Sequence, residues 1–115
     1  MSEQTTQDDV EVVAANIYSH PEQHGLTQYG EVEFAGGYEF DLLVVWRDAE
    51  GRFYYADDSG CSCPVPFELI RRADITAATR DEVAAHIKHR LRNTYSSSGN
   101  GAALDLLERL GGEPA

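Results

Sequence analysis

Three consecutive segments in the first half of the chain alternate apolar and polar side chains, and this pattern constrains the fold more than any other feature. The segments span residues 29–34, 38–47 and 52–56, and short runs rich in Gly, Asp and Glu separate them. Alternation with a period of two is typical of a β-strand that buries one face. Short connections between successive strands favour antiparallel pairing. The sequence therefore predicts a three-stranded antiparallel meander.

The lengths of the two turns decide which side chains share a face of this sheet. An odd-length loop after the first strand places Phe34 opposite Phe40, and a four-residue loop after the second strand places Trp46 opposite Phe53. A shift of one residue would move every side chain to the other face, so we prefer the registers that keep apolar side chains together. These registers predict one core face, made of Val32, Phe34, Phe40, Leu42, Val44, Trp46, Phe53 and Tyr55.

The same registers leave a second apolar group on the reverse face of the sheet. Leu43, Val45 and Tyr54 lie at one end of that face, and acidic residues lie at its other end. In one interpretation another segment of the chain, such as residues 10–17, covers these three side chains. In the other interpretation they form an exposed patch that binds a partner protein. We favour cover by the chain itself.

A capping box marks the start of the main helix. Thr79 is placed to cap the helix N-terminus, and Glu82 is placed to bond back to the backbone of Thr79. The helix is expected to run to about Asn93 with a buried stripe of Val83, Ala84, Ile87 and Leu91. A second, shorter helix is expected to dock on the domain through Leu104, Leu107 and Leu110.

These elements predict an α+β fold. A three- or four-stranded antiparallel meander packs one face on the helix at 79–93. We expect a disordered tail at 1–9, a single domain at 10–95, a flexible linker at 96–101, and a short C-terminal helix and tail at 102–115. A chain of 115 residues fits one domain with one core.

Composition limits the classes of partner. The net charge of −11 opposes non-specific binding to nucleic acid phosphates. No apolar run approaches the roughly 20 residues that cross a bilayer, and the polar start lacks the features of a signal peptide. We therefore expect a cytoplasmic protein without nucleic acid or membrane partners.

The segment 57–68 follows the third strand directly and reads Asp-Asp-Ser-Gly-Cys-Ser-Cys-Pro-Val-Pro-Phe-Glu. Both cysteines and two prolines within so short a run indicate a loop of defined shape. Phe67 is expected to enter the core. The candidate partner-binding residues are those of this segment and of the reverse sheet face, namely Leu43, Val45, Tyr54, Asp57, Asp58, Cys61, Cys63, Pro64 and Pro66.

Metal binding and cysteine catalysis are the alternatives to partner binding. The thiols of Cys61 and Cys63 with the imidazoles of His86 and His89 match the number of ligands of a zinc site. The spacing between the paired ligands is shorter than in the common zinc fingers, and the helical pattern turns His89 to solvent. The acidic residues around the cysteines disfavour a reactive thiolate. We expect reduced structural cysteines, with no catalytic residue, cofactor or metal.

The segment from Tyr38 through Glu68 resembles a family of small proteins of unknown function that bacteriophages of actinobacteria encode. The likeness covers residues 28–70, and the run Gly-Cys-Ser-Cys-Pro-x-Pro-Phe-Glu is its most specific part. The resemblance implies a viral origin and a role in the cytoplasm of an infected host cell. It supplies no catalytic residue. The expected function is that of an accessory protein that binds a host or phage protein, in an oligomeric state that the sequence does not define.

Overall fold

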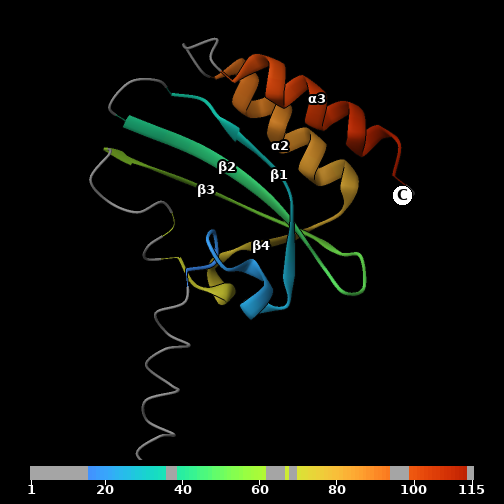
Figure 1. Ribbon diagram of the computed structural model, residues 1–115. Coiled ribbons are helices and arrows are strands. Elements are labelled where there is room, and N and C mark those ends of the chain that lie inside the picture. The colour runs from blue at the N-terminus through green and yellow to red at the C-terminus, as the bar shows by residue number, and fades with distance from the viewer. Residues whose placement is uncertain (1–15, 36–38, 62–66, 68–69, 94–98, 114–115) are drawn as a thin grey trace, which may run out of the picture.

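The computed structural model describes residues 16–35, 39–61, 67, 70–93 and 99–113, with the backbone alone at positions 39 and 61. A four-stranded antiparallel sheet with strand order β1-β2-β3-β4 forms its centre (Figure 1). The strands are β1 Leu26–Glu33, β2 Glu39–Asp48, β3 Phe53–Cys61 and β4 Thr76–Ala78. The helices are α2 Arg80–Arg92 and α3 Asn100–Gly111, with short 3₁₀ turns η1 Pro21–His24 and η2 Arg72–Asp74. The predicted α+β class is confirmed.

The sheet is buried on both faces. The helices α2 and α3 lie side by side over one face (Figure 1) and enclose a cluster of Val32, Phe34, Leu43, Val45, Phe53, Val83, Ile87, Ala103, Leu106 and Leu110. The opposite face carries a second cluster of Ile17, Leu26, Leu42, Val44, Trp46, Tyr54, Phe67 and Ile75. Both faces of the sheet are covered, and the central strand β2 is accordingly apolar at every position from Leu42 to Trp46.

Both strand registers differ by one residue from the prediction. Val32 pairs with Leu43 instead of Leu42, and Trp46 pairs with Tyr54 instead of Phe53. Directly paired residues project to the same face, so the single core face of the prediction is wrong. Of its eight members, Val32, Phe34, Phe53 and Tyr55 face the helices, whereas Phe40, Leu42, Val44 and Trp46 face the other side.

Gly51 explains the register between β2 and β3. Its φ of +86° lies in the left-handed region, which glycine adopts without strain. Its N–H donates to the carbonyl of Asp48 at 3.0 Å, and the N–H of Asp48 donates to the carbonyl of Arg52 at 3.0 Å. This is a three-residue hairpin loop with a left-handed residue at its end. The prediction assumed a loop of four residues, and the shorter loop displaces the pairing by one.

The register between β1 and β2 places Phe34 beside an acidic residue. The N–H of Phe34 donates to the carbonyl of Asp41 at 2.8 Å. The prediction avoided such pairing because it mixes apolar and charged side chains on one face. Arg90 of α2 makes the mixture stable, since its guanidinium lies 2.7 Å from the Asp41 carboxylate and 4.3 Å from the centre of the Phe34 ring.

The start of α2 agrees with the sequence pattern. The hydroxyl of Thr79 accepts from the N–H of Glu82 at 3.1 Å, and the Glu82 carboxylate accepts from the N–H of Thr79 at 2.8 Å. Val83 and Ile87 are buried, with Ala84 and Leu91 partly buried beside them, so the predicted stripe is confirmed.

The orientation of α3 differs from the prediction. Of the three leucines that were expected to dock, Leu110 is buried, Leu107 is partly buried, and Leu104 is 59% exposed. The positions that face the sheet are Ala103, Leu106 and Leu110. The predicted row has spacings of three and three residues, and the observed row has spacings of three and four, which follow one face of a helix more closely. The prediction overlooked this second row because it begins with an alanine.

Asp48 organises the turn between β2 and β3 through its carboxylate. One oxygen accepts from the N–H groups of Glu50 at 2.9 Å and Arg52 at 3.0 Å, and the other accepts from the hydroxyl of Tyr54 at 2.9 Å. Partial desolvation by itself would raise the pKa of Asp48. These hydrogen bonds and the one from the Arg52 side chain have the larger effect, and together they hold the pKa well below its ordinary value of 3.8.

We expect Asp48 to make the stability of the domain sensitive to acid. A carboxyl group whose pKa is lowered by folding contributes stability above its ordinary pKa of 3.8, and that contribution is lost as the pH falls through the folded value. Urea denaturation of the wild type and Asp48→Asn at a series of pH values below neutrality should show a steeper acid-induced loss for the wild type. Glu50→Gln should follow the wild type. Parallel curves for wild type and Asp48→Asn would exclude this role.

Candidate functional site

A cluster of charged side chains joins α2 to the beginning of β2 and the middle of β3. We call Asp41, Asp57, His86 and Arg90 the Arg90 cluster. His86 Nε2 lies 2.6 Å from an oxygen of Asp57, and the guanidinium of Arg90 bridges the carboxylates of Asp57 and Asp41. The ring of His86 also stacks on Tyr55 with a centroid distance of 4.4 Å. These contacts tie two strands to one helix.

The Arg90 cluster contains a carboxylate–imidazole pair, which in enzymes orients a histidine for proton transfer. Here both oxygens of Asp57 are engaged, one by His86 and the other by Arg90. Arg90 is itself shared between two carboxylates, and its side chain is only 15% exposed. The charges of the cluster therefore satisfy one another, and the geometry favours a structural role over catalysis.

The histidines of the proposed zinc site are engaged in other contacts. His86 bonds to Asp57, and His89 Nδ1 lies 3.2 Å from the side-chain amide of Asn93. The backbone of Cys61 pairs with β2, while Cys63 lies outside the described residues. Within the described part of the chain, no three His, Cys, Asp or Glu side chains are grouped so as to hold a metal ion. The zinc alternative thus stays a prediction that depends on the thiols.

The apolar members of the predicted partner surface are covered by the chain itself. Leu43 and Val45 are fully buried under the helices, and Tyr54 is 7% exposed on the other face. The guanidinium of Arg72 lies 4.4 Å from the centre of the Tyr54 ring. The interpretation as an exposed patch is therefore wrong, and the preferred interpretation, cover by the chain, is confirmed.

Phe67 anchors the chain after the cysteine segment. Its side chain is fully buried, as expected, and its ring packs edge-on against Trp46 at 5.7 Å. Its φ of +63° is strained for a bulky residue. The N–H of Phe67 donates to the Asp58 carboxylate at 2.7 Å, which helps to hold this conformation. Asp58 thus has a structural contact, while Pro64 and Pro66 lie outside the described residues.

The outer part of β3 has a free side among the described residues. The short strand β4 pairs with Phe53 to Tyr55 only, whereas β3 continues to Cys61. Asp48 and Arg52 form a hydrogen-bonded pair, and such pairs alternate along an antiparallel ladder. The even-numbered residues of β3 therefore bond to β2, and the odd-numbered residues direct N–H and C=O groups the other way. We call Asp57, Ser59 and Cys61 the open edge of β3.

A second surface feature lies between the two helices. A groove of about 500 Å³ is lined by Arg80, Asp81, Ala84 and Lys88 of α2 and by Leu104, Leu107, Glu108, Leu110 and Gly111 of α3. We call it the α2–α3 groove. The sequence pattern does not predict this groove, because the expected docking row places Leu104 and Leu107 in the core. The helical spacing of Ala103, Leu106 and Leu110 is the pattern that predicts the observed orientation of α3, with Leu104 on the exposed side of the helix.

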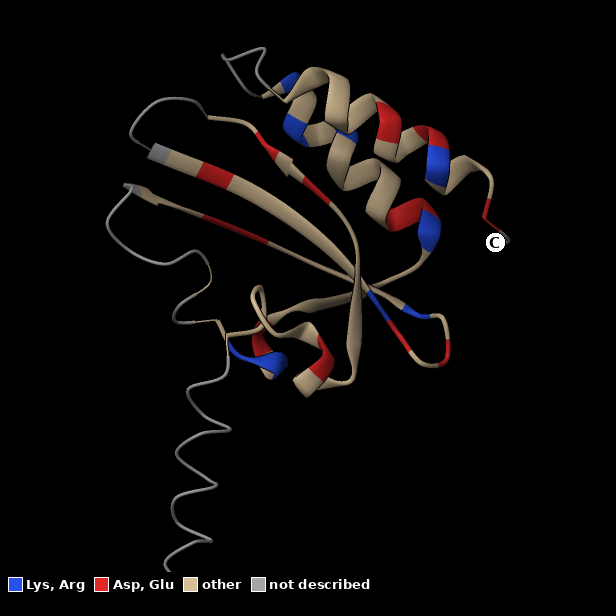
Figure 2. Cartoon of the chain, viewed as in Figure 1, with Lys and Arg blue, Asp and Glu red and all other residues tan. Residues whose placement is uncertain are grey.

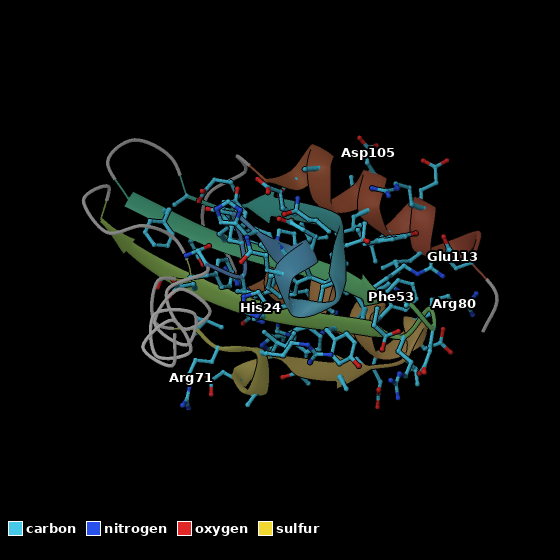
Figure 3. All side chains as sticks on the ribbon, turned by 60° about the horizontal axis from the view of Figure 1, so that its bottom comes forward. His24, Phe53, Arg71, Arg80, Asp105 and Glu113 are labelled. Atoms are coloured by element: carbon cyan, nitrogen blue, oxygen red, sulfur yellow. The ribbon has the colours of Figure 1, made fainter. Side chains whose placement is uncertain are left out.

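Glu113 fixes the end of α3 to the sheet. Its carboxylate accepts from the hydroxyl of Tyr29 at 3.0 Å and lies 3.4 Å from the guanidinium of Arg47. Arg80 donates to the backbone carbonyl of Glu113 at 2.6 Å, and both residues appear at the same end of the molecule in Figure 3. Burial and the bond to Glu113 raise the pKa of Tyr29. These contacts hold both helices in place beside the groove.

One comparison with known proteins gives a match, and this match covers nearly the whole chain. None of the helices in the described residues has the length and apolar character that a membrane crossing requires. Neither the curated proteins nor the solved structures include a match to this chain. A family model described as "Domain of unknown function (DUF7574)" matches residues 15–111, a range that includes all four strands and both helices. The chain therefore belongs to the DUF7574 family.

Proposed function

We propose that this domain binds another protein by accepting an extended segment of it as an added strand along the open edge of β3. The observation that carries the proposal is the outward direction of the backbone groups at Asp57 and Ser59, beyond the end of β4. An unpaired strand edge is a template for such addition, in which backbone hydrogen bonds supply affinity and side-chain positions supply specificity.

The edge is held in one conformation before any partner arrives. On its inner side β3 pairs with β2 along the whole length from Phe53 to Cys61. On the helix side Asp57 is fixed by His86 and Arg90. A preformed edge lowers the conformational entropy that is lost on binding. The side chains of the Arg90 cluster thus hold Asp57 in place, which leaves its backbone N–H and C=O groups available to a partner strand.

The charge around the edge suggests the character of the partner segment. Figure 2 shows acidic residues on β2 and β3 toward the ends away from β4. The carboxylate of Asp57 is already engaged by Arg90 and His86, so the attraction comes from Asp58 on the edge strand and from the net charge of −11 on the whole chain. An extended segment with basic side chains next to its strand residues fits this environment best.

The source of the chain is part of the same proposal. The resemblance of residues 28–70 to small actinobacteriophage proteins supports a phage accessory protein whose partner is a host or phage protein in the infected cell. The cysteine segment that contains Cys63, Pro64 and Pro66 follows β3 directly and stays a candidate part of the partner surface.

Ser59→Pro should abolish strand addition. Proline removes the outward N–H and places its ring on the edge, while the hydrogen bonds from β3 to β2 come from the even-numbered residues and stay intact. Linear peptides selected against the wild-type domain from a random displayed library should bind Ser59→Pro at least ~10-fold more weakly by calorimetry, or ~1.4 kcal/mol. Ser59→Ala, which keeps the N–H, should bind them like the wild type.

Hydrogen exchange gives the second readout. Bound peptide should slow exchange of the amide protons of Asp57 and Ser59, because each of them would donate to the added strand. Equal affinity of the selected peptides for Ser59→Pro and the wild type, without protection at these two amides, would exclude the edge as the binding site. Failure to select any linear peptide would also count against the proposal.

A further inference from the structure

We infer that the α2–α3 groove is a self-association surface and that its occupant is a second copy of this chain, packed around a two-fold axis. This surface lies on the helix layer, apart from the open edge of β3 (Figure 1), so the inference does not depend on the proposed function.

The apolar part of the surface matches itself. Leu104 projects from α3 and is 59% exposed, whereas Ala84 and Leu107, which also line the groove, are partly buried. In a two-fold arrangement each surface contacts its own counterpart. The Leu104 side chain of each copy would then enter the groove of the other copy. The dimer would thus bury both copies of the largest exposed apolar side chain among the described residues.

The charged part of the surface is complementary under the same rotation. Lys88 of α2 and Glu108 of α3 both line the groove, and neither has an ion pair with another described residue. The two helices are antiparallel, since Arg80 at the start of α2 bonds to Glu113 beyond the end of α3. Lys88 therefore lies toward the Leu104 end and Glu108 toward the other end. A two-fold axis reverses this order and sets Lys88 of each copy beside Glu108 of the other.

The outward row of α3 has the spacing that such packing needs. Gly101 and Gly111 lie near the two ends of the row that also contains Leu104 and Glu108, with spacings of three and four residues that keep all four on one side of α3. A Cβ atom at either glycine would meet nothing within 4 Å in the single chain. Packing within the chain therefore leaves both positions open, and their small size lets the helix ends approach.

Sedimentation equilibrium over a range of protein concentrations tests the inference. The wild type should form dimers, and Leu104→Asp should be monomeric. Lys88→Glu and Glu108→Lys should each raise the dimer dissociation constant at least ~10-fold, and the double variant should return to within ~3-fold of the wild type because it restores both pairs. Circular dichroism should show all variants folded, since the substituted side chains project into solvent in the single chain.

Two charge reversals outside the groove serve as matched controls. Arg92→Glu on α2 and Asp105→Lys on α3 change exposed residues that do not line the groove, and Figure 3 shows Asp105 pointing away from the domain. Both should dimerise like the wild type, as should Ser59→Pro. A monomeric wild type, a dimer that Leu104→Asp leaves intact, or a double variant that fails to recover would overturn the inference. An effect of the controls equal to that of the groove variants would overturn it too.

Discussion

Replacing Trp46 with alanine should lower the free energy of unfolding by about 3–5 kcal/mol. Trp46 is fully buried on the face of the sheet opposite the helices, and its indole packs edge-on against Phe67 with ring centroids 5.7 Å apart. Truncation removes both the buried apolar surface and this ring contact, and it leaves a cavity between the sheet and the segments that cover it. Such a loss is most of the stability of a marginal small domain.

Urea denaturation followed by circular dichroism measures this loss. Trp46→Phe is the informative companion variant. Because Trp46 Nε1 has no hydrogen-bond partner among the described residues, this substitution reduces the side-chain volume without removing a hydrogen bond to any of them. Leu104→Ala, compared with the wild type at a protein concentration low enough to keep both monomeric, is the control for an exposed apolar side chain and should change stability by less than about 0.5 kcal/mol. A loss below about 1 kcal/mol for Trp46→Ala would mean that this side chain is exposed to solvent.

Replacing Arg90 with methionine should lower the free energy of unfolding by about 2 kcal/mol, less than for a fully buried ion pair because solvent reaches both carboxylates. Methionine keeps the apolar stem near Phe34 but leaves Asp41 and Asp57 without their shared cation. The two carboxylates, which flank the same guanidinium, would then repel each other on a face that also contains apolar residues.

A double-mutant cycle separates this electrostatic contribution from packing. Asp41→Asn and Asp57→Asn should each reduce the cost of Arg90→Met, with a coupling energy above about 0.5 kcal/mol for each pair. Arg92→Met, two residues away and exposed, should have an effect within about 0.5 kcal/mol. Full additivity in both cycles would show that Arg90 stabilises the fold by packing alone.

The elements that the sequence predicted correctly depend on local chemistry. Alternation from Glu31 to Phe34 indicated β1 because successive side chains of a strand project to opposite faces whatever lies around it. The capping box at Thr79 and Glu82 defined the start of α2 because its two hydrogen bonds close within one helical turn. The stripe of Val83 and Ile87 followed from helical spacing. These signals need no information about the rest of the chain.

The candidate surfaces were predictable only in part. The sequence analysis singled out Asp57 and Cys61, which lie on the open edge of β3, but it had no means to see that edge. The edge exists because β4 is only three residues long. It was not predictable because the segment Thr76-Ala77-Ala78 has no alternating apolar pattern that would indicate a strand. The α2–α3 groove depends on which row of α3 faces the sheet, and the prediction considered only the row of Leu104, Leu107 and Leu110.

The sequence by itself determined the α+β class, the meander, the capped helix and the burial of Phe67, because each follows from short-range periodicity or composition. The tertiary structure alone decided the registers and therefore which face each strand residue occupies. The physical reasons are a left-handed Gly51 that shortens one loop by a residue, and Arg90, distant in sequence, whose charge lets Asp41 lie beside Phe34 on a buried face. Because β2 is apolar on both faces, its side-chain pattern does not select between registers one residue apart. The loop at Gly51 and the contacts of Arg90 with distant strand residues select the pairing.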